Sequence, residues 1–365
     1  MSKSKVLCVV GTRPNFIKIT QFEKEFNKYS SEFQFDLVHT GQHFDDRMST
    51  IFFEQLQLKK PKHSLFITEG NRTQKVKEII LQLEQLFLEE KPDLVIVVGD
   101  VDSTHAAAVA AKKLQIKIAH LESGLRSFDL EMPEEVNRIA VDKISDYFFV
   151  TEQSGIDNLK NEGVNNANIF FVGNTMIDTL VAFNEDIKSN QILNTLNLTP
   201  ENYILATFHR PSNVDNEQSL KIIIELINEI PKDLKVVIPI HPRTKNKITE
   251  FGLNHLIDNN PNIIQLEPID YFAFQHLILN AKVVLTDSGG IQEETTFRKV
   301  PCLTIRDNTE RPSTIEIGTN QLLALDKNLI LSKIKEVDGT KESKIPELWD
   351  GKATERIVEV LRKIV

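Results

Sequence analysis

The sequence has few of the features that would assign it to a specialised class of protein. Cysteine occurs only twice among 365 residues, at Cys8 and Cys302, and tryptophan only once. Each cysteine lies inside a short apolar run, and the chain has no Cys-x-x-Cys spacing. A disulfide framework and a zinc-binding motif therefore lack support. We predict two buried, reduced thiols and no metal site.

Long apolar runs are missing as well. Runs such as Leu94 to Val98 and Val236 to Ile240 suit buried strands and are far too short to span a bilayer. The amino terminus, Met1 to Lys5, leads into an apolar stretch that is too short for the hydrophobic part of a secretory signal peptide. We therefore expect a cytoplasmic protein.

Positive charge is not in excess, and two nucleotide-binding motifs are absent. The formal net charge is −9, so the chain has no overall attraction for nucleic acid or for an anionic membrane. An anionic ligand would need a local positive site. Because neither Gly-x-Gly-x-x-Gly nor Gly-x-x-x-x-Gly-Lys-Ser/Thr occurs, NAD and Walker-type ATP sites lack support, and we predict no cofactor.

Short apolar runs alternate with segments of helical period, such as Arg72–Glu90 and Ser219–Ile230. This alternation predicts parallel sheets with helices on both faces, the doubly wound α/β class. One sheet of about a dozen strands would be unusually wide, so two sheets of about six are expected. The runs are Val6–Val10, Phe35–Val38, Leu94–Val98, Ile116–Ala119, Tyr147–Val150, Ile169–Val172, Tyr203–Thr207, Val236–Ile240, Ile263–Leu266, Val283–Leu285 and Cys302–Ile305.

The chain length and a polar stretch between Asp178 and Glu201 predict two domains. We place the first at residues 1–180 and the second at residues 201–350. The tail, residues 352–365, is a helix candidate that we expect to pack back on the first domain.

Polar residues gather where the predicted strands end. In open parallel sheets, ligands bind outside the carboxyl ends of the strands, so we expect these two sheet edges to face one cleft. The polar strings begin at Gly11, His39, Gly99, His120, Phe208, His241 and Thr286.

The string Asp287-Ser288-Gly289-Gly290 predicts a site for an anion in the second domain. Adjacent glycines at a strand-to-helix turn let a phosphate approach the backbone N–H groups of the helix N-terminus. Arg13, His209 and Arg311 could bring positive charge or donors to the same place. Glu293 and Glu294, one turn later, either accept hydrogen bonds from a ribose diol or only complement the helix dipole.

Carboxylates are contributed by the first domain: Asp100, Glu122, and Glu134 or Glu135. Acids at separate strand ends can converge, and clustered carboxylates suit proton transfer near neutral pH. Alternatively, Asp100 is a helix N-cap and Glu134, after Pro133, only fills a first helical turn. A phosphate cradle in one domain and acids in the other suit a nucleotide-linked sugar.

Several strings together resemble those of the non-hydrolysing UDP-N-acetylglucosamine 2-epimerases, from about residue 6 to residue 325. The resemblance implies the two-domain GT-B fold of glycogen phosphorylase, a homodimer, and interconversion of UDP-GlcNAc and UDP-ManNAc for surface polysaccharide precursors. The strings that carry it are Gly11-Thr12-Arg13-Pro14, Thr40-Gly41-Gln42-His43, Gly99-Asp100, His120-Leu121-Glu122-Ser123-Gly124-Leu125-Arg126, Pro133-Glu134-Glu135-Val136-Asn137-Arg138, His209-Arg210, Thr286-Asp287-Ser288-Gly289-Gly290-Ile291-Gln292-Glu293-Glu294 and Thr309-Glu310-Arg311-Pro312.

The resemblance also implies a mechanism and a set of roles. UDP is eliminated across C1–C2 to leave 2-acetamidoglucal and then adds back, with a proton delivered to the other face of C2. Asp100, Glu122, Glu134 and His209 are the implied catalytic residues. The implied substrate-binding residues are Arg13, Lys18, Arg138 and Arg311 for diphosphate or sugar, Ser288, Gly289 and Gly290 for phosphate, and Glu294 for ribose.

Departures from the family pattern leave the hexosamine open, including a 2,3-diacetamido or 6-deoxy sugar. They lie near the expected sugar pocket, at Asn15, Ser123, Pro211-Ser212 and Ser313. Asp46 stands where members activated by a second UDP-GlcNAc have glutamine, so we do not predict that second site. The alternatives are a GT-B glycosyltransferase, a hydrolysing epimerase and a non-catalytic nucleotide-sugar sensor.

Overall fold

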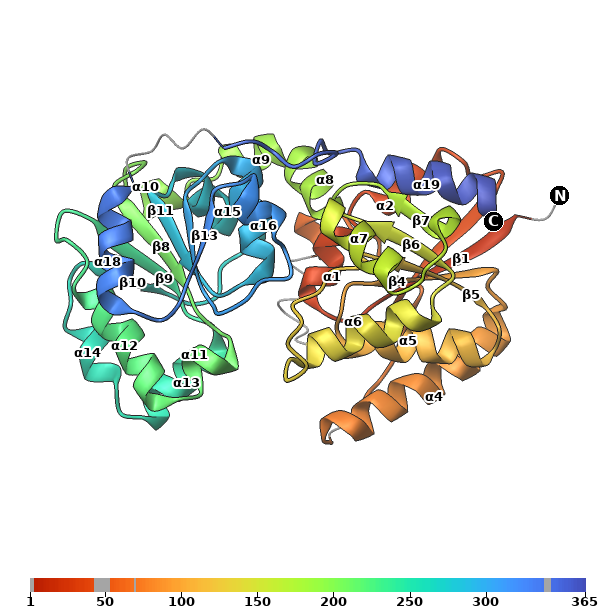
Figure 1. Cartoon of the computed structure of the whole chain (residues 1–365), viewed down its shortest axis with the longest axis horizontal. Coiled ribbons are helices and arrows are strands. Elements are labelled where there is room, and N and C mark those ends of the chain that lie inside the picture. Colours follow the sequence, from red (N-terminus) through yellow and green to blue (C-terminus); the bar gives the residue numbers. More distant parts are fainter. Residues whose placement is uncertain (1–2, 43–52, 69, 338–342) are drawn as a thin grey trace. The chain divides into compact units, whose positions relative to one another are not determined.

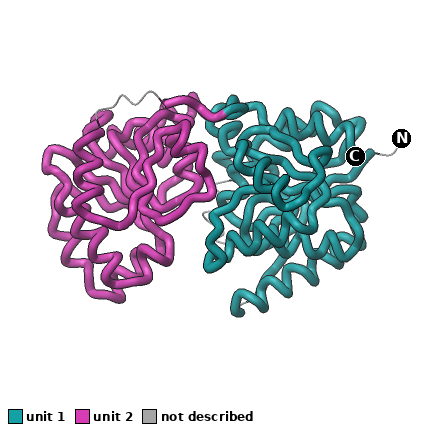
Figure 2. The backbone as a smooth tube through the Cα atoms, viewed as in Figure 1, with its two compact units in different colours: residues 1–182, 347–365 teal, residues 183–346 magenta. Residues whose placement is uncertain are grey.

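A computed structural model describes residues 3–42, 53–68, 70–337 and 343–365. The chain divides into two compact units (Figure 2). Unit 1 contains Met1–Ala182 and Glu347–Val365, and unit 2 contains Phe183–Pro346. His43 and Asp46 of the sequence motifs lie outside the described residues.

Unit 1 is built on a seven-stranded parallel sheet with the order β3-β2-β1-β4-β5-β6-β7. Figure 1 shows helices on both faces of this sheet, with α4, α5 and α6 together on one of them. The strands are β1 (Ser4–Val10), β2 (Phe33–His39), β3 (His63–Ser64), β4 (Leu94–Val98), β5 (Lys117–Leu121), β6 (Tyr147–Val150) and β7 (Ile169–Phe171). The helices are α1 (Arg13–Lys18), α2 (Phe22–Asn27), α4 (Arg72–Glu90), α5 (Asp102–Lys113), α6 (Pro133–Ile144), α7 (Gln153–Asn161), α8 (Thr175–Ala182) and α19 (Ala353–Ile364), with a 3₁₀ turn at Asn166–Asn168.

Unit 2 is built on a six-stranded parallel sheet with the order β10-β9-β8-β11-β12-β13. The strands are β8 (Tyr203–Thr207), β9 (Lys235–Pro239), β10 (Ile263–Leu266), β11 (Val283–Thr286), β12 (Cys302–Ile305) and β13 (Asn320–Leu323). The helices are α9 (Asn184–Lys188), α10 (Ile192–Thr195), α11 (Pro211–Val214), α12 (Glu217–Asn228), α13 (Pro242–Glu250), α14 (Asn254–Asp258), α15 (Tyr271–Asn280), α16 (Gly289–Arg298), α17 (Ser313–Glu316) and α18 (Lys327–Glu336).

The predicted doubly wound α/β class is therefore confirmed for each unit. The central strands read as continuous apolar runs because helices cover both faces of a parallel sheet, and every residue of β4 is buried. Small residues of α5, from Ala106 to Ala111, pack with Leu83 of α4 against β1 and β4. Cys8 and Cys302 are both buried free thiols, as predicted.

The C-terminal segment is anchored inside unit 1. Asp178, in the first turn of α8, accepts hydrogen bonds from the backbone N–H groups of Ala353 (3.0 Å) and Thr354 (2.6 Å). These bonds satisfy two of the free donors at the start of α19. The Trp349 indole donates to the carbonyl of Thr151 at 2.9 Å. Together these contacts hold α19 on the first unit, although the chain reaches it through unit 2.

No helix within the described ranges is both long enough and apolar enough to cross a membrane. What the fold contributes to function is the placement of strand ends. β1, β4 and β5 are neighbours and parallel, as are β8, β11 and β12, so the residues that follow each set share one sheet edge.

Candidate active site

Glu122 and Lys18 meet at the carboxyl edge of the unit 1 sheet. Glu122 directly follows β5 with a left-handed φ of +68°, and Lys18 is the last residue of α1. Both side chains are buried, and they form an ion pair. Gly99 makes room for this pair, because a Cβ atom there would lie only 3.3 Å from Lys18 Nζ.

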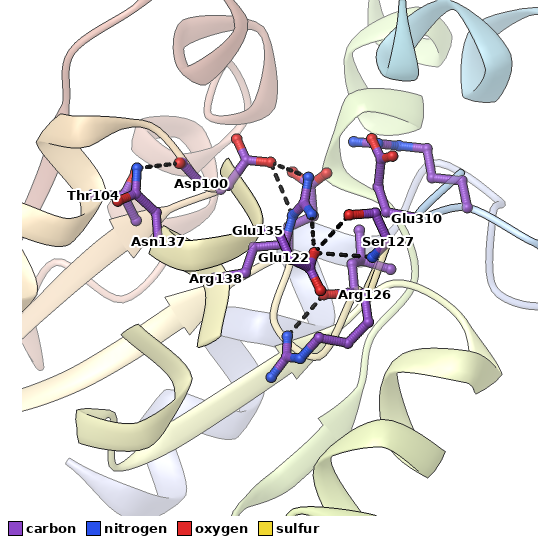
Figure 3. Close-up of polar contacts among 12 residues, drawn as sticks. Asp100, Thr104, Glu122, Arg126, Ser127, Glu135, Asn137, Arg138 and Glu310 are labelled. Atoms are coloured by element: carbon purple, nitrogen blue, oxygen red, sulfur yellow. Dashed lines mark hydrogen bonds and ion pairs between the residues drawn. The ribbon is translucent and has the colours of Figure 1, made fainter. Parts of the chain in front are cut away.

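Asp100 is held by Arg138 of α6 (Figure 3). Its Oδ2 accepts hydrogen bonds from Arg138 Nε at 3.0 Å and Nη2 at 2.7 Å, and its carbonyl accepts one from the Asn137 side chain at 2.9 Å. Arg138 is almost fully buried, whereas the Asp100 side chain is 22% exposed. The N-cap interpretation of Asp100 is wrong, since α5 begins at Asp102 with Val101 as its N-cap.

Glu134 and Glu135 are neighbours in sequence but have different surroundings. Glu135 is fully buried and accepts hydrogen bonds from the N–H groups of Ser127 and Phe128 and from Arg138. Glu134 is half-buried in the first turn of α6, and its side chain makes no hydrogen bond or ion pair with the described residues. Of the two carboxylates, Glu134 is the one available to a ligand.

A buried hydrogen-bond network around His120 and Asp142 connects the loops that carry Asp100 and Glu122. The sequence analysis did not predict it. The His120 ring bonds the carbonyl of Gly99 through Nε2 at 2.9 Å and Asp142 through Nδ1 at 2.6 Å. Asp142 also accepts the N–H of Gly124 at 3.1 Å and pairs with Arg126 at 2.7 Å. Burial alone would raise the pKa of Asp142, but His120 and Arg126 hold it below its usual value.

The spacing of three charged residues in α6 could have predicted this network. Glu135, Arg138 and Asp142 stand at i, i+3 and i+7, so they share one face of the helix, and all three are buried. Charged side chains on a buried helix face need hydrogen-bond or ion-pair partners. The loops that follow the strands supply these partners. Arg13, also predicted, is the half-buried first residue of α1, and two residues separate it from the end of β1.

In unit 2, Asp287 organises the strand end that carries His209. The buried Asp287 carboxylate accepts hydrogen bonds from the backbone N–H groups of His209 (3.0 Å) and Arg210 (2.9 Å) and from Asn213 (3.1 Å). Although burial would raise the pKa of Asp287, these partners hold it below its ordinary value. His209 Nδ1 lies 3.0 Å from Asp287, so Nε2 is the ring nitrogen that can meet a ligand.

The start of α16 has the features of an anion site. Ser288 is its N-cap residue, and the Ser288 side chain makes no capping hydrogen bond with the described residues. Gly289 and Gly290 form the first turn, where backbone N–H groups lack helical acceptors. A Cβ atom at Gly289 would lie 2.5 Å from Arg311 Nη1, so glycine allows that guanidinium to approach the turn.

Arg311 belongs to a buried chain of charges. It pairs with Glu293 at 3.0 Å and with Glu310, and Glu310 also pairs with Arg306 at 2.9 Å. Burial lowers the pKa of Arg306, and its Nη1 has no hydrogen-bond partner among the described residues. Sequence reasoning missed Arg306 and Glu310. Because Arg306 directly follows β12, the strand-end rule applied to the other strands could have found it.

The predicted residues thus fall into two groups, one in each unit. Unit 1 gathers its residues at the edge formed by β1, β4 and β5, and unit 2 at the edge formed by β8, β11 and β12. Glu294 lies in the second turn of α16 and is buried. Within the described ranges, no three His, Cys, Asp or Glu side chains are grouped so that they could hold a metal ion. The unit 1 group is Arg13, Lys18, Asp100, Glu122, Glu134 and Arg138, and the unit 2 group is His209, Ser288, Gly289, Gly290, Glu294 and Arg311.

Comparison with known proteins identifies relatives along the whole chain. A family model described as UDP-N-acetylglucosamine 2-epimerase matches residues 24–362. The UDP-N-acetylglucosamine 2-epimerase of Methanocaldococcus jannaschii is 40% identical, over 98% of this chain and 98% of that protein. The UDP-2,3-diacetamido-2,3-dideoxy-D-glucuronate 2-epimerase of Pseudomonas aeruginosa is 39% identical, over 99% of this chain and 100% of that protein. The crystal structure of the M. jannaschii enzyme in complex with UDP-GlcNAc and UDP has a TM-score of 0.91 at 40% identity, covering 98% of this chain and 99% of that one.

Proposed function

Because the chain belongs to the UDP-N-acetylglucosamine 2-epimerase family, we propose that it inverts C2 of a UDP-linked 2-acetamidohexose, interconverting UDP-GlcNAc and UDP-ManNAc. The observation that carries the proposal is the pairing of Asp100 with Arg138 and of Glu122 with Lys18. These two carboxylates follow adjacent strands and are each oriented by a cation.

The C2 proton of such a sugar is not next to a carbonyl group, so direct abstraction is difficult. Elimination of UDP across C1–C2 gives 2-acetamidoglucal, and re-addition with a proton on the opposite face completes the inversion. Proton traffic on two faces needs more than one acid–base group. Asp100, Glu122 and Glu134 supply these groups.

Unit 2 supplies the groups that hold UDP. The N–H groups of Gly289 and Gly290, the hydroxyl of Ser288 and the guanidinium of Arg311 stabilise the negative charge that develops on the departing diphosphate. His209, oriented by Asp287, donates from Nε2 to the same group. Glu294 accepts the ribose hydroxyls. Arg13, Lys18 and Arg138 contact the sugar and its proximal phosphate.

A second substrate is favoured by one specific relative. The P. aeruginosa protein is named for a 2,3-diacetamido sugar acid, and its identity of 39% is close to the 40% of the M. jannaschii enzyme. Sequence identity therefore does not separate UDP-GlcNAc from UDP-2,3-diacetamido-2,3-dideoxyglucuronate. In either case the chemistry at C1 and C2 is the same.

The test is an incubation in deuterated water with each UDP-hexosamine in turn and no other substrate. We expect deuterium at C2 in a product that keeps its UDP, followed by NMR and mass spectrometry. A glycosyltransferase would leave the C2 proton in place and require an acceptor, and a hydrolysing epimerase would release UDP and free N-acetylmannosamine. Absence of C2 exchange with every sugar would contradict the proposal.

We also propose that the protein acts in the cytoplasm as a homodimer. Free, buried thiols at Cys8 and Cys302 suit a reducing compartment. Leu81 and Leu88 stand seven residues apart on α4 and are 54% and 61% exposed, which gives a partner copy an apolar surface. Light scattering on wild type and on a Leu81→Glu, Leu88→Glu variant tests this. A dimer that the double substitution leaves intact would place the interface elsewhere.

A further inference from the structure

Phe128 lies in the loop between β5 and α6 and has an unusual backbone. Its φ is +60°, in the left-handed region that bulky L-residues avoid because Cβ approaches the backbone. Its ring is also 78% exposed, so the side chain gains little from packing within the protein. A strained backbone that presents an aromatic ring to solvent is not explained by folding stability.

The strain is imposed by Glu135. This fully buried carboxylate accepts hydrogen bonds from Ser127 N at 2.9 Å, Ser127 Oγ at 3.0 Å and Phe128 N at 3.1 Å. Three bonds from two consecutive residues fix the loop in one conformation. The position of the Phe128 ring is therefore set by a side chain in the first turn of α6.

The same carboxylate orients the acid–base machinery. Glu135 accepts a hydrogen bond from Arg138 Nη1 at 2.6 Å, and Arg138 holds Asp100 through Nε and Nη2. Figure 3 shows this continuous path from Ser127 through Glu135 and Arg138 to Asp100. Glu134, the adjacent residue, is one of the proposed acids. The loop of Phe128 is thus built onto the side chains that surround the reacting sugar.

We propose that Phe128 is a substrate-contacting residue that packs against the hexose, on its C–H face and the methyl of its 2-acetamido group. The inference rests on the proposed function and adds a specificity contact to it. The six residues that we grouped at the unit 1 edge are all charged, so none of these six supplies an apolar surface for an acetamido methyl. Sugar sites combine a few polar groups with apolar and aromatic walls, and aromatic rings offer the largest contact at low entropic loss.

Substitution by glycine separates contact from stability. Glycine adopts a φ of +60° without strain, so Phe128→Gly should leave the melting temperature unchanged or higher. We expect kcat/KM to fall by about tenfold or more, the size of effect that a missing apolar contact produces. Phe128→Tyr keeps the ring and should retain activity. Leu130→Ala, which removes a 70% exposed apolar side chain from the same loop, is the matched control and should leave kcat/KM unchanged.

Calorimetry gives a second readout that does not need turnover. Phe128→Gly should weaken binding of UDP-GlcNAc, or of the hexosamine the wild type prefers, and leave binding of UDP alone unchanged. If wild type shows no turnover with any sugar, the proposed function fails, and this comparison still decides the role of Phe128. A Phe128→Gly variant with sugar-nucleotide affinity and kcat/KM within about twofold of wild type would overturn the inference. The inference would also be overturned if Phe128→Gly lost activity only because it no longer formed the dimer, as measured by light scattering.

Discussion

Lys18 and Glu122 lie 104 positions apart in the chain and form a buried ion pair beside Gly99. Each residue comes from a different strand end, one after β1 through α1 and the other directly after β5. The pair therefore joins two loops that the sheet brings to the same edge. The contribution of this ion pair to the free energy of unfolding can be measured separately from its contribution to catalysis.

A double-mutant cycle on this pair should show strong coupling. Lys18→Met or Glu122→Gln alone leaves one buried polar group without its partner and should lower the free energy of unfolding by about 3–5 kcal/mol. The double variant should lose less than the sum, as measured by urea denaturation. Lys28→Met removes a half-exposed lysine from its pair with Glu25 and should change stability by about 1 kcal/mol or less. Additive losses at Lys18 and Glu122 would contradict the pairing.

Asp142 should affect turnover without touching the substrate. Asp142→Asn weakens the bonds to His120 and Arg126, so the Gly99 and Gly124 turns that carry Asp100 and Glu122 shift. We expect kcat to fall by about 100-fold, the effect of a displacement of roughly 1 Å. UDP affinity should stay constant, because most of the proposed UDP groups lie in unit 2 and Asp142 bonds His120, Gly124 and Arg126 rather than any proposed phosphate contact of unit 1.

The matched control for Asp142 is Asp146→Asn. Asp146 follows the same helix but pairs with the exposed Lys117 and does not bond the two acid-bearing turns. Its substitution should leave kcat unchanged. An equal fall in kcat for both variants, or a parallel loss of UDP affinity, would mean that Asp142 acts only through general stability.

The sequence predicted most of the architecture because its strands are buried on both faces and read as continuous apolar runs. The two strands that it missed, β3 and β13, lack that signal. β3 has only two residues, His63 and Ser64, and β13 begins with Asn320 and Gln321. Both lie at sheet edges, where one side of the strand has no neighbour and the apolar pattern weakens.

The candidate site was predictable to the extent that its residues directly follow strands. Asp100, Glu122 and Ser288 could be found by that rule alone. Glu135, Asp142 and Glu310 could not, because none of them directly follows a strand and their importance lies in the groups that their carboxylates hold in place. The choice between Glu134 and Glu135 likewise needed the structure, since only burial separates two adjacent carboxylates.

Stability at acidic pH should depend on Asp287. Its partners hold its pKa below the ordinary value, so its contribution is present above a pH of about 4 and is lost as pH falls through the lower folded-state pKa. The difference in free energy of unfolding between wild type and Asp287→Asn should be largest at neutral pH and shrink below about pH 4. Urea titrations over that range measure it.

Asp178 provides a control, because its contribution to stability should change with pH in the opposite direction. Burial raises the pKa of Asp178 despite its hydrogen bonds to α19. Its contribution is therefore full below a pH of about 4 and falls as pH rises through the raised folded-state value. The difference in free energy of unfolding between wild type and Asp178→Asn should therefore decrease as the pH rises. If the two differences in free energy of unfolding changed in the same direction with pH, the opposite pKa shifts of Asp287 and Asp178 would be contradicted.

The glycine turn at α16 should be sensitive to a single methyl group. In Gly289→Ala the new Cβ would lie 2.5 Å from Arg311 Nη1 and 2.6 Å from Glu310 Oε1, so the guanidinium must move. We expect UDP affinity to fall by about tenfold or more, the loss of one charge-assisted hydrogen bond. Gly290→Ala should weaken UDP binding directly by crowding the phosphate. Gly163→Ala introduces strain at a φ of +84° but meets no atom within 4 Å, and should leave calorimetric UDP affinity unchanged.

Glu134 and Glu135 should respond in opposite ways to the same chemical change. Glu134→Gln alters a half-buried side chain with no partner among the described residues, so stability should be preserved while C2 deuterium exchange falls by about 100-fold or more. Glu135→Gln weakens the bonds to Ser127, Phe128 and Arg138 and should lower the free energy of unfolding by about 3 kcal/mol or more. Exchange rates and urea denaturation on both variants distinguish the roles. If Glu134→Gln exchanged deuterium at the wild-type rate, the third acid would have to be sought elsewhere, because Glu135 is fully buried and already accepts four hydrogen bonds.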